Sequence, residues 1–131
     1  MRYLTLAEAL TIGEAVTGIS AAVLASASRL DLLDSALHAP RAGFGDVEFY
    51  AEFADKAAVL TVRIAKNHPL PDGNKRLAWQ SLTLFCALNG FDLEVPTDEA
   101  VDLMLGVASG NHNEASVAAW VTQRMRPRES T

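Results

Sequence analysis

Cysteine is nearly absent from the sequence, and this excludes two kinds of stabilising framework. Cys86 is the single cysteine in 131 residues, so no disulfide can form within the chain. Combined with His38, His68 and His112, it gives no ligand spacing that is typical of a zinc site. Because Cys86 lies in an apolar helical stretch, we expect a buried structural thiol.

An excess of positive charge is also missing. The formal net charge is −5, whereas proteins that bind nucleic acids usually present a basic face to the phosphates. No segment is long and apolar enough to span a membrane. Residues 15–28 are uncharged, but they lack the basic start and the strongly apolar block of a signal peptide. We therefore expect a cytoplasmic protein that relies on neither direct nucleic-acid contacts nor a membrane.

Helical patterns account for most of the sequence. Hydrophobic residues make up 50% of the chain, which is enough for one buried core and predicts a single domain over residues 1–131. Apolar residues recur at helical spacing over residues 6–16, 30–37, 46–66, 74–88, 97–108 and 115–125. Residues 18–28 are ambiguous, and no alternating strand pattern of useful length appears. The prediction is an all-α, compact bundle of about six short helices.

Two of the predicted helix starts carry recognisable caps. Thr5 and Glu8 have the spacing of a capping box at the start of the first helix. Asp46 can cap the long third helix. Residues 40–46, directly before it, are rich in turn formers and predict an exposed loop.

The break between the two central helices concentrates polar groups in a few residues. Two prolines and a glycine within residues 68–73 must interrupt the helix, and the helical pattern resumes at Asn74. A helix N-terminus offers free N–H groups, and Gly73 lets the backbone approach an anion closely. Lys75 and Arg76 add full positive charges. This combination predicts a phosphate-binding site.

The same loop holds groups suited to a metal ion and to proton transfer. Asp72, beside a phosphate site, is a natural ligand for Mg²⁺, which prefers one or two carboxylates plus phosphate oxygens. The imidazole of His68 can take a proton from a hydroxyl near neutral pH. The alternative is an ordinary turn followed by an ordinary helix cap, because Pro-Asp-Gly-Asn is a common turn sequence. No Walker-type glycine-rich loop is present, which excludes the commonest ATP site.

The nine residues from His68 to Arg76 resemble the signature of the Fic/Doc family, whose usual form is His-x-Phe-x-(Asp/Glu)-Gly-Asn-(Gly/Lys)-Arg. Residues 32–37 and 85–90 also look like the death-on-curing (Doc) branch of that family. The resemblance implies a Fic/Doc-type helical bundle with the motif loop between two central helices. It also implies a transferase that uses ATP and Mg²⁺ to modify another protein.

The resemblance implies a role for each residue of the motif. His68 would be the catalytic base, and Asp72 would be the Mg²⁺ ligand. Gly73, Asn74 and Lys75 would form the anion-binding nest, and Arg76 would clamp a phosphate. Leu70 replaces the usual phenylalanine, an anchor residue, and we expect the change to cost some rigidity of the loop but not the chemistry.

Two departures from the signature bear on the reaction. Family members that transfer AMP usually have glycine in place of Lys75 and a second arginine in place of Trp79. Doc proteins share the lysine and phosphorylate a target, for which elongation factor Tu is the known substrate. The resemblance therefore favours a kinase-type toxin that blocks translation and arrests growth. AMP transfer and a catalytically silent binding module are the alternatives.

Two further expectations concern partners. Some family members inhibit themselves through a helix with Ser or Thr four positions before Glu, and this spacing does not occur here. The resemblance thus implies a separate antitoxin whose disordered tail folds along the domain. Residues 40–46 would form a flap over the active site, with Phe44 touching the target. A plain connector is the alternative for this segment.

Overall fold

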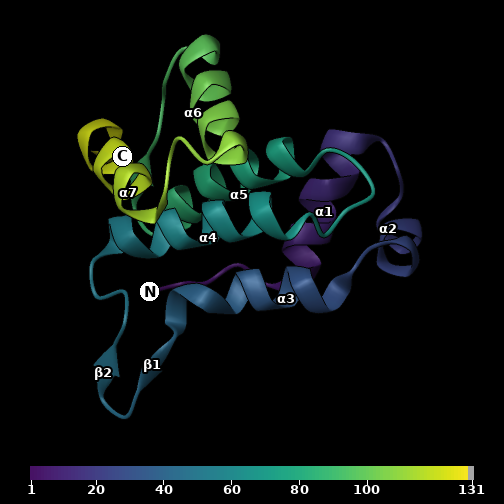
Figure 1. Cartoon of the computed structure of the whole chain (residues 1–131), viewed down its shortest axis with the longest axis horizontal. Coiled ribbons are helices and arrows are strands. Elements are labelled where there is room, and N and C mark those ends of the chain that lie inside the picture. The colour runs from purple at the N-terminus through teal and green to yellow at the C-terminus, as the bar shows by residue number, and fades with distance from the viewer. Residues whose placement is uncertain (130–131) are drawn as a thin grey trace.

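Seven α-helices form most of the chain over residues 1–129, the part that this computed structural model describes (Figure 1). They are α1 (Leu6–Thr17), α2 (Ala21–Ala27), α3 (Leu30–His38), α4 (Phe53–Asn67), α5 (Asn74–Leu88), α6 (Thr97–Ser109) and α7 (Glu114–Arg124), with a 3₁₀ turn η1 (Ala39–Arg41) after α3. The predicted all-α fold with two central helices around the motif loop is confirmed. The motif loop is defined here as residues 68–73.

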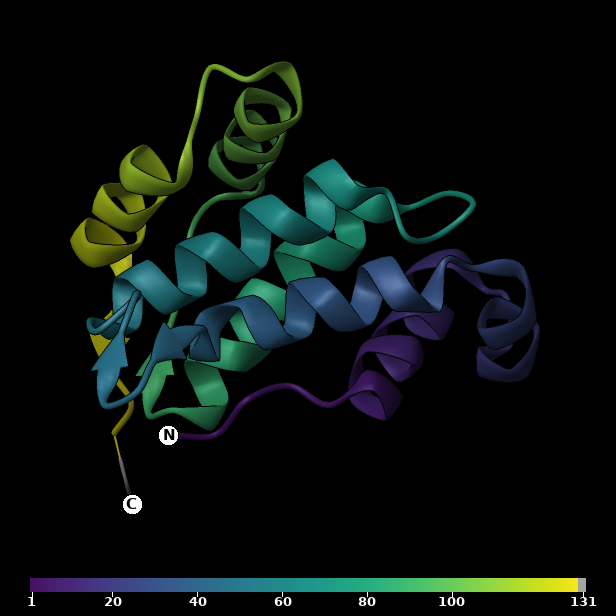
Figure 2. The same cartoon turned by 60° about the horizontal axis from the view of Figure 1, so that its bottom comes forward.

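Helix α4 is the centre of the packing. It packs against α3, α5 and α7, and the views in Figures 1 and 2 both show it running alongside α3. Ala57, Leu60 and Ile64 are completely or nearly completely buried, and they belong to the same hydrophobic core as Leu77 and other apolar residues of α5. A helix buried on most sides is held rigidly by its neighbours. The motif loop is therefore flanked by two helices that pack against each other in the core.

The single cysteine lies in this core. Cys86 is fully buried on α5, as the sequence predicted. Burial in apolar surroundings raises the pKa of its thiol to about 12, so the thiolate needed for reactivity does not form near neutral pH.

Two short antiparallel strand pairs were not expected from the sequence. In the first, β1 (Gly43–Phe44) pairs with β2 (Val47–Glu48), and α4 begins only at Phe53. The prediction of a helix starting at Asp46 is therefore wrong. Gly45 has a φ of 60°, and with Asp46 it forms a two-residue hairpin turn that requires glycine first. Since Gly-Asp between short runs is a hairpin signal, the sequence did hold a clue.

The second strand pair joins the end of the chain to the end of α5. Strand β3 (Phe91–Asp92) pairs with β4 (Arg126–Pro127), and the Arg128 N–H donates to the Gly90 carbonyl oxygen at 2.8 Å. The first residues reach the same place, because the Arg2 backbone exchanges two hydrogen bonds with the Asn89 side chain, each 2.8 Å long. Both ends of the described chain are thus fastened at neighbouring residues.

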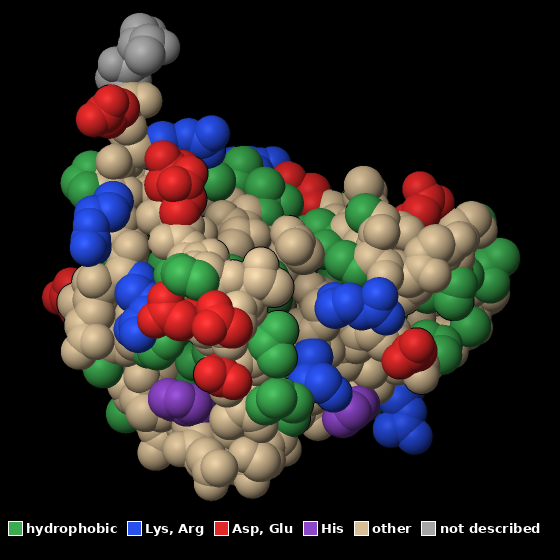
Figure 3. Space-filling view, turned by 90° about the horizontal axis from the view of Figure 1, so that it is seen from above, with side chains coloured by type: hydrophobic (Ala, Val, Ile, Leu, Met, Phe, Trp, Pro, Cys, Tyr) green, Lys and Arg blue, Asp and Glu red, His purple; other side chains and the backbone are tan. Residues whose placement is uncertain are grey.

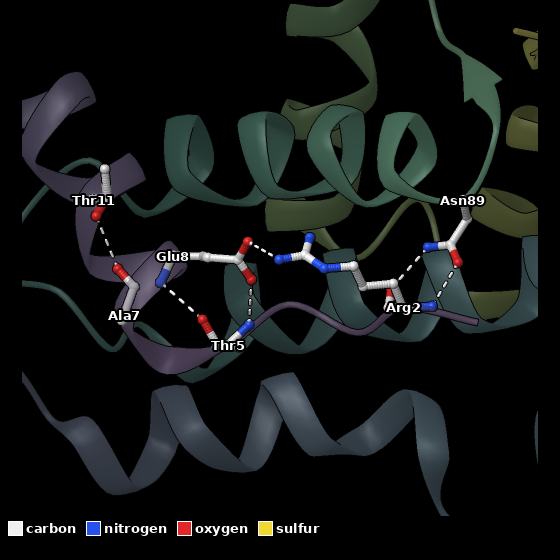
Figure 4. Close-up of polar contacts among 6 residues, drawn as sticks. All are labelled: Arg2, Thr5, Ala7, Glu8, Thr11 and Asn89. Carbon is white, nitrogen blue, oxygen red and sulfur yellow. Dashed lines mark hydrogen bonds and ion pairs between the residues drawn. The ribbon is translucent and has the colours of Figure 1, made fainter. Parts of the chain in front are cut away.

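The N-terminus of α1 carries the predicted capping box (Figure 4). The Thr5 hydroxyl accepts from the Glu8 N–H at 3.1 Å, and a Glu8 carboxylate oxygen accepts from the Thr5 N–H at 2.9 Å. Arg2 adds an ion pair to the same carboxylate at 2.6 Å. The hydrogen bond from the Thr5 backbone is the main cause that lowers the pKa of Glu8. The start of α1 is therefore well fixed.

The ambiguous residues 18–28 contain a turn and a short helix. Gly18 ends α1 with a φ of 75°, and the Ser20 side chain caps α2 by accepting from the Val23 N–H. None of the described helices alone is long and apolar enough to cross a membrane. By length and composition α1 and α2 pass this test together, and they are bent by 105° at the break between them.

Candidate active site

The motif loop lies at the C-terminal end of α4 and the N-terminal end of α5, and in Figures 1 and 2 it projects beside α1 and α2. His68 ends α4 in the left-handed region, with φ 48° and ψ 54°. It is the one non-glycine residue with a positive φ among residues 1–129. Such a conformation costs energy and persists only where surrounding contacts enforce it, and it is typical of functional sites.

Asn74 fastens the loop from inside. It is 7% exposed, its side-chain oxygen accepts from the Leu70 N–H at 2.9 Å, and its amide donates to the Leu70 carbonyl at 3.0 Å. These two bonds satisfy a buried backbone segment that has no place in a helix. The Asn74 side chain therefore holds the loop closed, while its backbone N–H stands at the open start of α5.

The same amide faces the His68 ring. The Asn74 side-chain nitrogen lies 3.3 Å from Nδ1 of His68. Because Leu70 fixes the orientation of the amide, its N–H groups point toward the ring and Nδ1 accepts. A neutral His68 in this arrangement carries its hydrogen on Nε2.

Leu70 anchors the loop to α1. It is 4% exposed, and a Cβ added at Gly13 of α1 would lie 3.5 Å from Leu70 Cδ1 and 3.0 Å from Leu24 Cδ1. Glycine at position 13 thus allows the close approach of the loop to α1. Leucine in the anchor position is therefore a core residue.

The structure brings the predicted motif residues together around one hollow of about 250 Å³. Its lining consists of His68, Pro71, Asp72, Gly73, Asn74, Lys75 and Arg76. Lys75 and Arg76 are exposed in the first turn of α5, where unpaired N–H groups and the positive end of the helix dipole also lie. Figure 3 shows Lys and Arg side chains gathered beside one of the histidines on the face that it presents. The hollow is suited to a phosphate group.

Asp72 fits the role of a Mg²⁺ ligand. It is exposed, lines the same hollow, and takes part in none of the ion pairs formed within residues 1–129. No group of three or more His, Cys, Asp or Glu side chains in this part of the chain is arranged to hold a metal by itself. A single carboxylate is nevertheless sufficient for Mg²⁺ when a bound nucleotide supplies phosphate oxygens and water completes the shell.

Three contacts from outside the motif hold the site in place, and the sequence gave no sign of them. The Arg76 guanidinium donates to the Val16 carbonyl in the last turn of α1 at 2.7 Å. The Arg29 N–H donates to the Pro69 carbonyl at 2.8 Å, and the Asn67 side chain to the Leu32 carbonyl at 3.1 Å. The segments that border the motif loop are therefore the end of α1 and the start of α3.

Phe44 does not lie in this site. The β1–β2 hairpin is placed before the start of α4 and the motif loop after its end, and Figures 1 and 2 both show them at opposite ends of that helix. Fifteen helical residues span about 22 Å. Phe44 is 83% exposed, but it cannot cover His68 in this arrangement. The predicted flap over the active site is not found in residues 40–46.

A larger apolar groove adjoins the phosphate hollow. Its volume is about 630 Å³, and it runs between α1, α5 and α6. Its lining consists of Ala15, Val16, Lys75, Arg76, Trp79, Gln80, Val95, Thr97, Ala100, Val101, Met104 and Leu105. Lys75 and Arg76 line both spaces, so the groove opens directly beside the phosphate hollow. Val101 and Leu105 are about half exposed along it.

Fold and site together define a helical domain with an anion-binding loop between two buried helices. Comparison with known proteins gives the same answer: the sequence model of the Fic/DOC family matches residues 3–86. The chain belongs to this family. It is also 42% identical over 90 residues to the curated protein Toxin Doc of Mycolicibacterium smegmatis, covering 67% of this chain and 69% of that protein. The match from residue 3 includes α1 and α2, which precede all the residues that carry the resemblance in the sequence.

Proposed function

We propose that the chain is the toxin of a toxin–antitoxin pair and transfers a phosphate group from ATP to a hydroxyl of a target protein. Elongation factor Tu is the expected target. The observation that carries this proposal is the convergence of His68, Asp72 and the two basic residues of α5 on one small hollow. The similarity to a protein named Toxin Doc supports the toxin role.

In the proposed transfer, the motif residues have different roles. Lys75, Arg76 and the first N–H groups of α5 bind and orient the phosphates. The target oxygen forms a bond to the γ-phosphorus, the bond from that phosphorus to the β–γ bridging oxygen breaks, and ADP leaves. His68 takes the hydroxyl proton. Mg²⁺, which Asp72 would hold, neutralises phosphate charge when it is bound.

Proton transfer to His68 requires one local change. Nε2 can accept a proton only when the neutral ring carries its hydrogen on Nδ1, and Nδ1 now faces the Asn74 amide. Because His68 is exposed, its ring is free to turn away from this contact. We infer that binding of nucleotide and target exchanges the Asn74 contact for one with a hydrogen-bond acceptor.

Lys75 and Trp79 favour phosphate transfer over AMP transfer. Lysine in the nest crowds the usual seat of the distal phosphates and favours a reversed nucleotide with its γ-phosphate nearest His68. Trp79 packs edge-on against Trp120 with ring centroids 6.0 Å apart, so it contributes packing where AMP-transferring relatives have a second phosphate-binding arginine.

The test is the intact mass of elongation factor Tu after incubation with the chain, Mg²⁺ and ATP. The expected gain is one phosphate, absent with His68→Ala and retained with His38→Ala, a matched change at an exposed histidine outside the site. A gain of one AMP would replace the proposed chemistry but keep the site. No gain here and none in a lysate with labelled ATP would favour a silent binding module.

We further propose that the disordered tail of an antitoxin occupies the apolar groove. The groove is mostly apolar and open, and it borders the phosphate hollow, so a bound tail would obstruct the nucleotide. Leu105→Asp should leave growth arrest intact and prevent rescue by a co-expressed antitoxin. Rescue of Leu105→Asp as complete as that of the unaltered chain would place the antitoxin elsewhere.

A further inference from the structure

The last turn of α1 lies against the phosphate-binding residues, although 60 residues separate Val16 from Arg76 in sequence. Carbonyl groups in the last turn of a helix have no helical partner and form the negative end of its dipole. A guanidinium is well suited to this position, and its contact with Val16 uses one of its five N–H donors. The remaining donors stay available for a phosphate.

Thr17 is the side chain of α1 that lies against Gly73, on the same side of this glycine as the guanidinium of Arg76. A Cβ added at Gly73 would lie 3.0 Å from Thr17 Cγ2 and 3.4 Å from Nη2 of Arg76. The Thr17 methyl group and the guanidinium therefore both border the space beside the bare Cα of Gly73. A side chain at position 73 would crowd both groups and would be strained at the φ of 80°.

The position of the Thr17 methyl group is itself fixed. The Thr17 hydroxyl donates to the Gly13 carbonyl at 2.7 Å and accepts from the Ile19 N–H at 3.1 Å. Two hydrogen bonds on one hydroxyl hold a single rotamer of this β-branched side chain. Half-buried Thr17 thus presents a fixed apolar surface to the start of α5.

We propose that Thr17 is a positioning residue that orients Arg76 for the phosphate of the nucleotide. The proposal rests on the proposed function, because it assigns Arg76 to a nucleotide phosphate. Thr17 does not touch the nucleotide in this proposal. It acts by bordering the space beside Gly73 that the guanidinium also borders, next to the Val16 carbonyl that the guanidinium binds, so that the Arg76 side chain loses little rotamer freedom when the phosphate binds.

The test is a titration of the folded chain with Mg²⁺ and ATP, followed by NMR so that millimolar dissociation constants can be measured. Thr17→Ala is expected to weaken ATP binding three- to tenfold. Thr17→Val keeps the shape of the side chain and is expected to stay within twofold of the unaltered chain. Thr11→Ala is the matched control, because Thr11 makes the same kind of bond to the Ala7 carbonyl on α1, away from the site.

A second set of variants separates positioning from general loosening of α1. In an Arg76→Gln background, Thr17→Ala is expected to have no further effect on ATP binding, because its partner is gone. An unchanged dissociation constant for Thr17→Ala, or the same loss with and without Arg76, would overturn the proposal. If the unaltered chain bound no ATP, the proposed function would fail and this inference with it. If it bound ATP and Thr17→Ala had no effect, this inference alone would fail.

Discussion

Lys75 occupies the second position of α5 and lines both the phosphate hollow and the apolar groove. In the proposed function, its charge and length take up space that a glycine at this position would leave open. We expect Lys75→Gly to lower phosphate transfer at least tenfold and to yield some AMP-modified target, because the nucleotide can then bind in the opposite direction. The measurement is the mass of the modified target.

A lysine nearby supplies the control for this prediction. Lys66 is exposed in the last turn of α4 and does not line the hollow, so Lys66→Gly should keep phosphate as the product. An unaltered product and rate for Lys75→Gly would mean that Lys75 does not choose the orientation of the nucleotide.

The sequence identified the motif residues but not the residues that hold them in place. His68, Asp72, Gly73 and Arg76 lie within nine consecutive residues, so their common location follows from the local break in the helices. Val16 and Thr17 are distant in sequence and have ordinary side chains. Their role depends on how α1 packs against α5, and no short-range pattern encodes that packing.

Among the elements, α1 connects the stability of the fold to the site, because its first turn is capped and its last turn holds Arg76. The capping box and ion pair lower the pKa of Glu8. A carboxylate with a lowered pKa contributes stability that is complete above its ordinary value, about 4.3, and is lost as the pH falls through the folded value. Stability should therefore fall at acid pH partly through Glu8.

Glu8→Gln is expected to flatten this part of the acid transition and to cost about 1 kcal/mol at neutral pH. Urea unfolding at several pH values would measure both effects. Glu94→Gln, at an exposed glutamate, is the control and should leave the curve unchanged. An identical pH dependence for Glu8→Gln and the unaltered chain would show that the cap contributes nothing.

The helices also show which structural features could be predicted from the sequence and which could not. Helical periodicity located α1 and α3 to α7, because their apolar faces repeat over several turns. The predicted start of α4 was wrong, since Phe49 and Phe53 fit a helical repeat although residues 43–48 form a β-hairpin. The two-residue hairpin turn, and not the helical repeat of apolar residues, determines the structure of this segment.

For the molecule as a whole, α3 and α4 run side by side in opposite directions, and this decides what the hairpin can reach. A connection between two antiparallel helices lies at their shared end, and the motif loop must then lie at the other end. The fold class could be predicted from composition and periodicity. The distance between Phe44 and His68 could not, because it depends on helix direction.

This separation leads to a prediction for Phe44. Phe44→Ser should leave the dissociation constant for ATP within twofold of its original value, since about 22 Å of helix lies between the hairpin and the motif loop. Titration with ATP measures this directly, and Gly73→Ala, which places a methyl group at a φ of 80° and 3.4 Å from Arg76 Nη2, is the positive control. Weaker ATP binding in Phe44→Ser would show that the hairpin communicates with the site.

Arg2 is hydrogen-bonded to Asn89, and Arg128 to Gly90, so the two ends of the described chain lie at adjacent residues. These residues are at the end of α5 that lies far from the motif loop. A short linker can therefore join the ends without disturbing the helices, and new ends can be opened in the exposed turn of the β1–β2 hairpin. Such a circularly permuted chain should fold and keep its active site. The original chain, divided into two fragments at the same hairpin turn, should become toxic only when the fragments assemble.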